Sequence, residues 1–150
     1  MSQNIQTELL SPASQLPNWI DPVKEADLVA RRRDIHRLPE TGWTEFIATA
    51  RATEFFASLG FKVLVGREFI DPVYVRGRSE SAGLVATFDT GRPGKTIAFR
   101  VELDALKMNE PHDESHIPFR EGFVSERPGS MHACGHDGHQ AVAFELARFI

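Results

Sequence analysis

The sequence predicts a domain of the α/β class, in which helices and short buried strands share one core. Two segments near the amino end carry helix start and stop signals, three short apolar runs typical of strands follow, and the last residues return to helical spacing. With 150 residues, of which 41% are hydrophobic and 25% charged, the chain is long enough for one domain of ordinary globular composition.

The helices near the amino end are predicted from their capping signals. The first helix is expected to begin with Asp21 as its cap and Pro22 at its first position, and to end before Pro39. The second helix is expected over residues 43–59, with Gly60 closing its carboxyl end. Apolar side chains fall on two sides of this second helix, which predicts that more than one layer covers it.

The strands are predicted at residues 61–65, 83–88 and 96–101, where short apolar runs are typical of buried strands. The last two flank a turn at residues 90–94 and are therefore expected to pair as a hairpin. Residues 105–130 contain several prolines and glycines without a sustained period. A segment of this kind is predicted to be a long loop, either functional or disordered.

The final helix is predicted over residues 140–150, starting only after His139 because glycines interrupt the preceding segment. This apolar helix has no stop signal, so we expect the chain to be the amino-terminal portion of a longer protein. Residues 1–20 are polar and are predicted to form a loose arm, which leaves residues 21–150 for the folded part.

Charge and cysteine content exclude several classes of partner and site. The formal net charge of -4 and the pI of about 5.9 give no electrostatic reason to expect nucleic acid or a membrane as partner. The arginines at positions 31–33 are balanced by neighbouring acidic residues and are predicted to form a solvated helix face. A single cysteine excludes an intramolecular disulfide, and no signal peptide or membrane span is recognisable, so the predicted compartment is the cytoplasm.

The strongest candidate for chemistry is the segment 131–139, which reads MHACGHDGH and gathers the only cysteine with three of the six histidines. Spacing alone leaves three interpretations open. Cys134 and His136 could converge on one metal ion, because positions i and i+2 of an extended segment project to the same side. Alternatively, the segment is a polar turn in which Asp137 caps the final helix, or Cys134 is a nucleophile with a histidine base.

Other polar residues are weaker candidates. Glu102 and Asp104 place two carboxylates on one side at the end of a predicted strand, which suits either the surroundings of a metal or a hydrogen-bonded pair. His112 and His116 lie in the long loop, where contact with substrate or water is expected rather than a metal pair. His36 is expected at the end of the first helix, where a positive charge favours the helix dipole.

Three motifs, in this order, resemble those of the metal-dependent amidohydrolases of metallopeptidase family twenty, which include aminoacylases, hippurate hydrolases and auxin-conjugate hydrolases. The matching segments are RRDIH and PETGWTE at 32–36 and 39–45, AFRVELDAL at 98–106, and MHACGHDGH at 131–139. A further run, GLVATFDTGRPG at 83–94, is similar to one of the subunit types of the aminobenzoyl-glutamate hydrolases within this family.

The resemblance implies the amino-terminal part of a three-layer α/β/α catalytic domain with a mixed sheet, whose remainder and dimerisation domain lie outside the chain. It also implies that Cys134 and His136 are ligands of zinc or manganese, and that Asp104 orients a ligand from behind. The implied reaction is hydrolysis of the amide bond of N-acyl or N-aroyl amino acids, such as aminobenzoyl-glutamate, by a metal-activated water with a glutamate as general base.

Two departures from the family pattern matter. Glu102 stands where the family usually has an aspartate, so its role stays open. The general-base glutamate and the further ligands lie outside these residues, and two protein ligands fall short of the three that catalytic zinc needs. We therefore expect a dimeric enzyme that is competent only in the longer protein. The alternative is a non-catalytic fragment or pseudoenzyme that acts as a metal-binding or interaction module.

Overall fold

The computed structural model describes residues 22–75, 78 and 81–150. The longer helices of this part are α1 (Pro22–Arg37), α2 (Phe46–Ser58) and α5 (His136–Ala147), and the strands are β1 (Lys62–Val65) and β2 (Leu84–Thr87). The short elements η2 (Gly66–Glu68), α3 (Pro72–Val75) and α4 (Ile117–Arg120) lie in the connections. None of the helices in this part combines the length and the apolar character that crossing a bilayer requires.

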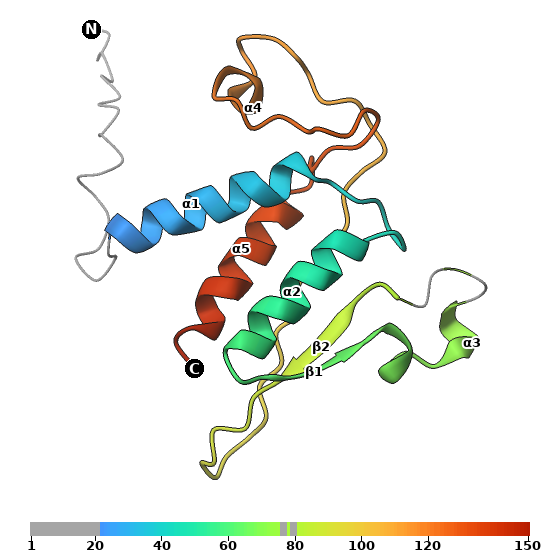
Figure 1. Ribbon diagram of the computed structural model, residues 1–150, viewed down its shortest axis with the longest axis vertical. Helices are drawn as coiled ribbons and strands as arrows, with labels where there is room; N and C mark the ends of the chain where they lie inside the picture. Colours follow the sequence, from blue (N-terminus) through green and yellow to red (C-terminus); the bar gives the residue numbers. More distant parts are fainter. Residues whose placement is uncertain (1–21, 76–77, 79–80) are drawn as a thin grey trace, which may run out of the picture.

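The packing order of the helices explains the two-sided apolar pattern of α2. In Figure 1, α1 lies against α5, and α2 lies against both α5 and the sheet. On the sheet side, the hydroxyl oxygen of Thr49 accepts a hydrogen bond from the amide of Gly83 at 2.9 Å. The buried core between the helices consists of Ile35, Ala52, Ala141 and Phe144. More than one layer therefore covers α2, as its sequence predicted.

The first two helices lie close to their predicted positions. α1 ends at Arg37, while the predicted cap Asp21 and the arm at residues 1–20 lie outside the described residues. α2 starts later than expected, at Phe46, because Trp43 has a φ of 70°. A residue in this left-handed conformation cannot continue a right-handed helix.

The strand pairing differs from the predicted hairpin, which is therefore wrong. β2 pairs with β1 in antiparallel orientation, with Lys62 opposite Thr87. The run 96–101, predicted as the third strand, is not a strand in the structure. A strand forms only where a neighbour satisfies its backbone hydrogen bonds, and the described part of the chain places no such partner beside this run.

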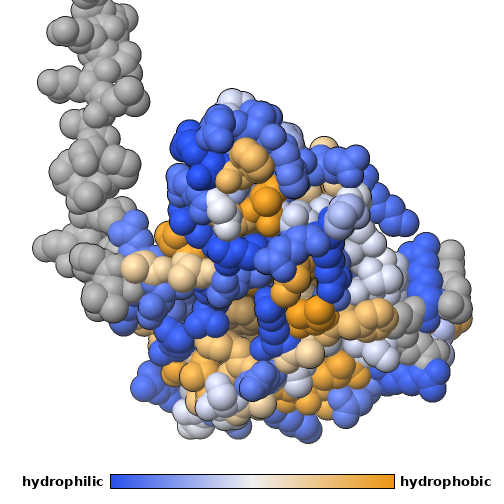
Figure 2. All heavy atoms as spheres, turned by 45° about the horizontal axis from the view of Figure 1, so that its top comes forward, coloured by the Kyte–Doolittle hydropathy of each residue, from blue (hydrophilic) through white to orange (hydrophobic). Residues whose placement is uncertain are grey.

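The unpaired run leaves large apolar side chains open to solvent. Ile97 and Phe99 are 78% and 69% exposed. Figure 2 shows further hydrophobic residues reaching the surface at several places on one face of the molecule. Contiguous exposed apolar surface commonly marks a place where another chain or segment packs.

The arginines that were predicted to form a solvated face of α1 contact other segments. The guanidinium of Arg31 lies 4.9 Å from the ring centre of Phe55, and that of Arg33 lies 4.6 Å from the ring centre of Phe123. Arg32 forms an ion pair with the first turn of α5. The helix is therefore less freely solvated than its charge balance suggested, because arginine packs its planar head on aromatic rings.

Helix α5 starts earlier than predicted. It begins at His136, because Gly135 adopts a left-handed conformation (φ 86°, ψ 14°) and its carbonyl accepts hydrogen bonds from the amides of Gly138 and His139 at 3.0 and 3.2 Å. The expectation of a helix start after His139 is therefore wrong. Asp137 does not cap the helix as the polar-turn interpretation required; it lies buried in the first turn.

The carboxylate-bearing segment is held beside the segment that leads into α5. Leu106 and Met131 exchange two backbone hydrogen bonds of 3.0 Å each, and Ala105 pairs with Thr41 in a parallel bridge. The side-chain amide of Gln140 donates to the carbonyl of Leu103 at 3.2 Å. These contacts bring residues far apart in the sequence to one end of the molecule.

A buried cluster of charged groups connects α1, the long loop and α5. The Nδ1 and Nε2 atoms of His36 lie 2.8 Å from carboxylate oxygens of Asp137 and Glu110, respectively. Their exposed fractions are 3% for His36, 0% for Asp137 and 7% for Glu110. His116 adds a contact of 2.7 Å to Glu110, and Arg32 a contact of 3.1 Å to Asp137. His36 therefore bridges two carboxylates, and the prediction of a helix-end histidine did not anticipate this.

The contacts within the cluster favour the charged forms of His36 and Asp137. Burial lowers the pKa of His36, but its hydrogen bonds to Asp137 and Glu110 outweigh burial and leave the pKa above its ordinary value. Burial raises the pKa of Asp137, but the hydrogen bond from His36 and the charge of Arg32 outweigh it and lower this pKa to about 2. Below its raised pKa, His36 is thus a cation between two carboxylates.

Replacing His36 by glutamine should remove the cation and leave buried carboxylates short of a donor. Breaking a buried ion pair costs about 3–5 kcal/mol, which is the loss we expect in the free energy of unfolding near pH 6. The stabilisation from a raised pKa is present below the unfolded value of about 6.5 and is lost as pH rises through the folded value. The loss caused by His36→Gln should therefore shrink toward alkaline pH in urea denaturation followed by circular dichroism.

The matched control is His112→Gln, which changes an exposed histidine outside the cluster and should leave the free energy of unfolding unchanged. A loss for His36→Gln that is the same at every pH between about 6 and 9 would contradict a charged role for His36.

Candidate metal centre

Asp104 fixes the orientation of the His136 ring at the start of α5. The Nδ1 atom of His136 lies 2.9 Å from the backbone carbonyl oxygen of Asp104 and 3.1 Å from its Oδ1. A carbonyl oxygen only accepts, so Nδ1 carries a proton, and in the neutral imidazole Nε2 is then the nitrogen with the free lone pair. An oxygen acceptor behind a histidine is the usual arrangement that prepares the other ring nitrogen to bind a metal.

His139 lies one helical turn after His136, and Glu102 lies beside it. The two imidazole rings are stacked, with centres 5.6 Å apart. The Nδ1 atom of His139 is 3.2 Å from Oε2 of Glu102. One donor atom from each of Glu102, His136 and His139 lies within 4.8 Å of the other two. The pKa of Glu102 is below its ordinary value, because its own backbone amide and then His139 donate hydrogen bonds to the carboxylate.

Cys134 lies at the surface, two residues before His136. The left-handed Gly135 between them makes the turn that opens α5. Within the part of the chain that the structure describes, the group of three donors does not include the sulfur of Cys134. The assignment of Cys134 and His136 as metal ligands, and of Asp104 as the residue behind them, remains a prediction.

Two polar atoms beneath this turn lack a partner among the described residues. They are Nδ1 of His132 and Oδ1 of Asp137, and both side chains are buried. Burial lowers the pKa of His132 to about 4. His132 is therefore neutral at physiological pH. The charged groups near it are the carboxylate of Asp137 and its partners His36 and Arg32.

The two loop histidines do not come together as a metal pair. His116 contacts the carboxylate of Glu110, and His112 packs its ring 5.4 Å from that of Phe119. Sequence reasoning missed the pairing of Glu102 with His139. The spacing of three residues between His136 and His139 was the available signal, but it places both rings on one face only when the helix starts at His136.

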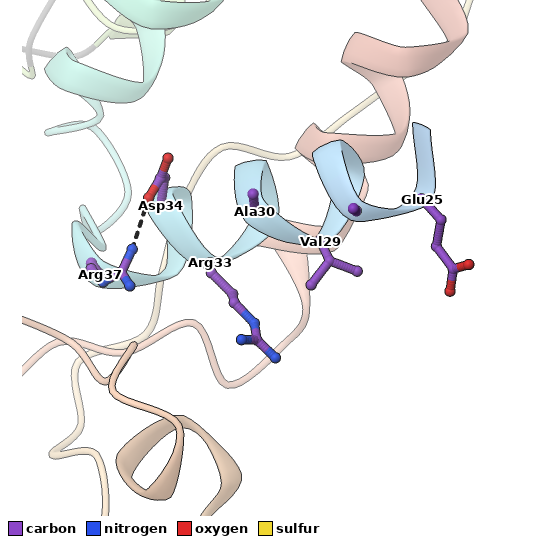
Figure 3. A pocket seen from close by; sticks show the side chains of 7 residues that line it. Glu25, Val29, Ala30, Arg33, Asp34 and Arg37 are labelled. Carbon is purple, nitrogen blue, oxygen red and sulfur yellow. Dashed lines mark hydrogen bonds and ion pairs between the residues drawn. The ribbon is translucent and has the colours of Figure 1, made fainter. Parts of the chain in front are cut away.

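Two hollows on the surface lie apart from the candidate metal centre. The hollow in Figure 3 is lined entirely by α1, and the side chains of Asp34 and Arg37 at its edge form an ion pair of 2.7 Å. A second hollow is lined by residues of α1, α2 and Phe144. Cys134, His136 and Glu102 line neither of them.

Proteins with similar sequences include hydrolases. The chain is 41% identical to indole-3-acetyl-aspartic acid hydrolase of Enterobacter agglomerans, over 79% of this chain and 34% of the relative. It is 40% identical to a subunit of p-aminobenzoyl-glutamate hydrolase from Escherichia coli (strain K12), over 77% of this chain and 33% of the relative. The chain thus spans about one third of the length of these relatives. No family model matches it.

Solved structures give the same assignment. A Bacillus subtilis protein described as a dinuclear metal-binding peptidase of the M20 family matches 87% of this chain and 32% of its own, with a TM-score of 0.64 and 27% identity. A protein from methicillin-resistant Staphylococcus aureus that is described as an aminohydrolase matches 85% of this chain and 29% of its own, with a TM-score of 0.65 and 32% identity. The predicted α/β fold is thereby confirmed, and so is the resemblance of these 150 residues to the M20 family, which the three motifs predicted.

Proposed function

We propose that these residues supply one side of the metal centre of an amidohydrolase that cleaves the amide bond of N-acyl or N-aroyl amino acids. One observation carries the proposal: Asp104 holds the proton on Nδ1 of His136, which leaves Nε2 free to bind a cation. Cys134 adds a thiolate two residues earlier, on the same turn. The hydrolases among the relatives support the reaction class.

The donors fit a borderline-soft divalent cation. Thiolate and imidazole are the ligands that zinc prefers, whereas manganese favours carboxylate and water. The pair Cys134 and His136 therefore favours zinc, and manganese becomes the better fit only if oxygen donors complete the site. Imidazole binds zinc in its neutral form through a free nitrogen, and the hydrogen bond to Asp104 selects the neutral tautomer of His136 in which that nitrogen is Nε2.

A bound cation would polarise the scissile carbonyl and lower the pKa of a water molecule. The residues of this chain prepare the site for it. Gly135 lets the backbone turn between the two ligands, and Asp137 anchors that turn to α1 through His36. A glutamate acting as general base is expected from the rest of the protein, so we propose that the 150 residues alone do not hydrolyse substrate.

The proposed substrate is aminobenzoyl-glutamate or a related N-acyl amino acid. Two of the relatives, p-aminobenzoyl-glutamate hydrolase and indole-3-acetyl-aspartic acid hydrolase, have names that join an acyl or aroyl group to an acidic amino acid. The first of these is named as one subunit of its enzyme, which supports assembly with another chain, and we propose a dimer that works in the cytoplasm. The exposed apolar run with Ile97 and Phe99 offers a surface for the remainder of the enzyme.

A non-catalytic metal-binding or interaction module is the alternative function. It is favoured by the group of three donors at Glu102, His136 and His139, which needs no general base to hold a cation. Hydrolysis of p-aminobenzoyl-glutamate by a protein that contains these residues and the rest of the domain supports the enzyme. Tight metal binding without hydrolysis in that same protein supports the module.

In that longer protein, Cys134→Ala should abolish both hydrolysis of p-aminobenzoyl-glutamate and stoichiometric binding of zinc or manganese, because it removes one ligand of the centre. The measurements are metal content by mass spectrometry and product release. An exposed serine changed to alanine, Ser115→Ala, is a control of similar size at a distance in sequence. Retention of both metal and activity in Cys134→Ala would falsify the assignment.

Asp104→Ala should weaken metal binding without removing a ligand. The loss of a hydrogen-bonding group behind a ligand histidine typically lowers affinity by about 10–100-fold. Competition with a coloured chelator measures this change, and Asp89→Ala removes an exposed aspartate outside the site as the control. Equal affinities for Asp104→Ala and the unchanged protein would show that the carboxylate of Asp104 does not orient His136, because the variant keeps the backbone carbonyl.

A further inference from the structure

The segment that carries Asp104 also carries a second carboxylate that points at the start of α5. Glu102 lies 3.2 Å from His139, and one donor atom from each of Glu102, His136 and His139 lies within 4.8 Å of the others. The hydrogen bonds between Leu106 and Met131 hold the two segments together, so the arrangement rests on the backbone fold.

We propose that Glu102 and His139 are further ligands of the cation at His136, so that this chain alone supplies enough donors to bind a divalent metal ion. The inference rests on the proposed function insofar as a cation binds at His136. It goes beyond that function because it assigns two ligands in addition to Cys134 and His136.

The distances require only a small adjustment. Zinc lies about 2.0–2.2 Å from nitrogen and oxygen ligands, so two donors on one ion are at most about 4.4 Å apart. The contact of 3.2 Å between His139 and Glu102 already satisfies this limit. No separation in the group exceeds 4.8 Å, so any pair beyond the limit has to approach by only a few tenths of an ångström. The side chains of His139 and Glu102 are 58% and 31% exposed, so this hydrogen-bonded pair has room for a shift of that size.

The chemistry of the group is also suited to a cation. Two imidazoles and one carboxylate are a ligand set that zinc accepts at catalytic sites, and they leave a fourth position open. Glu102 brings the negative charge that the two neutral rings lack. Cys134, which lies one residue before Gly135 in the same turn, can add a fourth protein donor, and water would then take the fifth position to which catalytic zinc can expand.

The hydrogen bond between His139 and Glu102 has a role in the metal-free chain. It holds both side chains beside His136 before a cation arrives, because an imidazole nitrogen that donates to a carboxylate fixes the positions of both groups. The stacked ring of His136 keeps its Nδ1 directed at Asp104, so the two histidines are held by different carboxylates. A cation bound by both side chains would take the place of this hydrogen bond, and its proton would be released to solvent.

The experiment titrates the 150-residue chain with cobalt(II) alone, followed by competition with zinc(II). We expect one cobalt ion per chain in the unchanged protein. Glu102→Gln and His139→Gln should each weaken cobalt and zinc binding by at least about tenfold, because each removes a direct ligand. The thiolate-to-cobalt absorption from Cys134 should persist at saturating cobalt in both variants, which shows that the turn is intact.

Matched controls are Glu114→Gln and His112→Gln, which make the same chemical changes at exposed positions outside the group. Glu102→Asp is a conservative variant with a shorter side chain, and it should recover part of the affinity that Glu102→Gln loses. Circular dichroism of each variant shows whether it folds as the unchanged chain does.

Two outcomes overturn the inference. If Glu102→Gln and His139→Gln bind cobalt as tightly as their controls, the two residues are not ligands, although Cys134 and His136 can still be. If the unchanged 150-residue chain binds no cobalt, the chain does not supply enough donors. The proposed function fails separately, when Cys134→Ala in the longer protein keeps both metal and hydrolysis.

Discussion

The bridge that His36 forms between Glu110 and Asp137 is the contact on which the rest of the structure depends. It joins three parts of the chain: the end of α1, the long loop and the first turn of α5. Burying an unpaired carboxylate costs free energy of folding, so the pairing of His36 with both Glu110 and Asp137 allows these carboxylates to be buried here. The segment 107–131 contains only one short helix among the described residues, and its position follows from contacts of this kind.

The candidate metal centre lies next to this bridge in the sequence and is positioned by it. Asp137 is tied to α1, and the next residue back along the chain is His136. Backbone hydrogen bonds between Leu106 and Met131 also hold the segment that leads into this turn. The same pairing places Glu102 and Asp104 beside the start of α5. The candidate ligands Cys134 and His139 are exposed, while His36 and Asp137, which anchor the turn to α1, are buried. This division suits a site that must exchange water and substrate yet keep its geometry.

Much of the local structure could be predicted from sequence, because local signals determine it. The limits of α1, β1 and β2 followed from proline, glycine and apolar runs, and the motif around Cys134 predicted the resemblance to the M20 family. The pairing of strands could not be predicted, since the run at 96–101 has the composition of a strand but no partner in the described residues. The cluster around His36 was missed because its other members, Glu110 and Asp137, lie 74 and 101 residues away in the chain.

The start of α5 shows how one local error changes the interpretation of a site. Two glycines within residues 135–138 suggested an irregular turn, yet only Gly135 is left-handed, and Gly138 lies within the helix. With the helix starting at His136, His139 moves to the same face and Glu102 becomes its partner. A family resemblance identifies only residues that match a motif. Glu102 departs from the motif, so its pairing with His139 could be found only from the three-dimensional structure.

The most direct test of the central claim is the X-ray absorption spectrum at the zinc edge of the zinc-loaded protein. We predict one sulfur at about 2.3 Å together with nitrogen or oxygen neighbours at about 2.0–2.2 Å, because Cys134 and His136 bind the same ion. A coordination shell of nitrogen and oxygen alone would contradict this claim, since the thiolate of the only cysteine in the chain would then lie outside the centre.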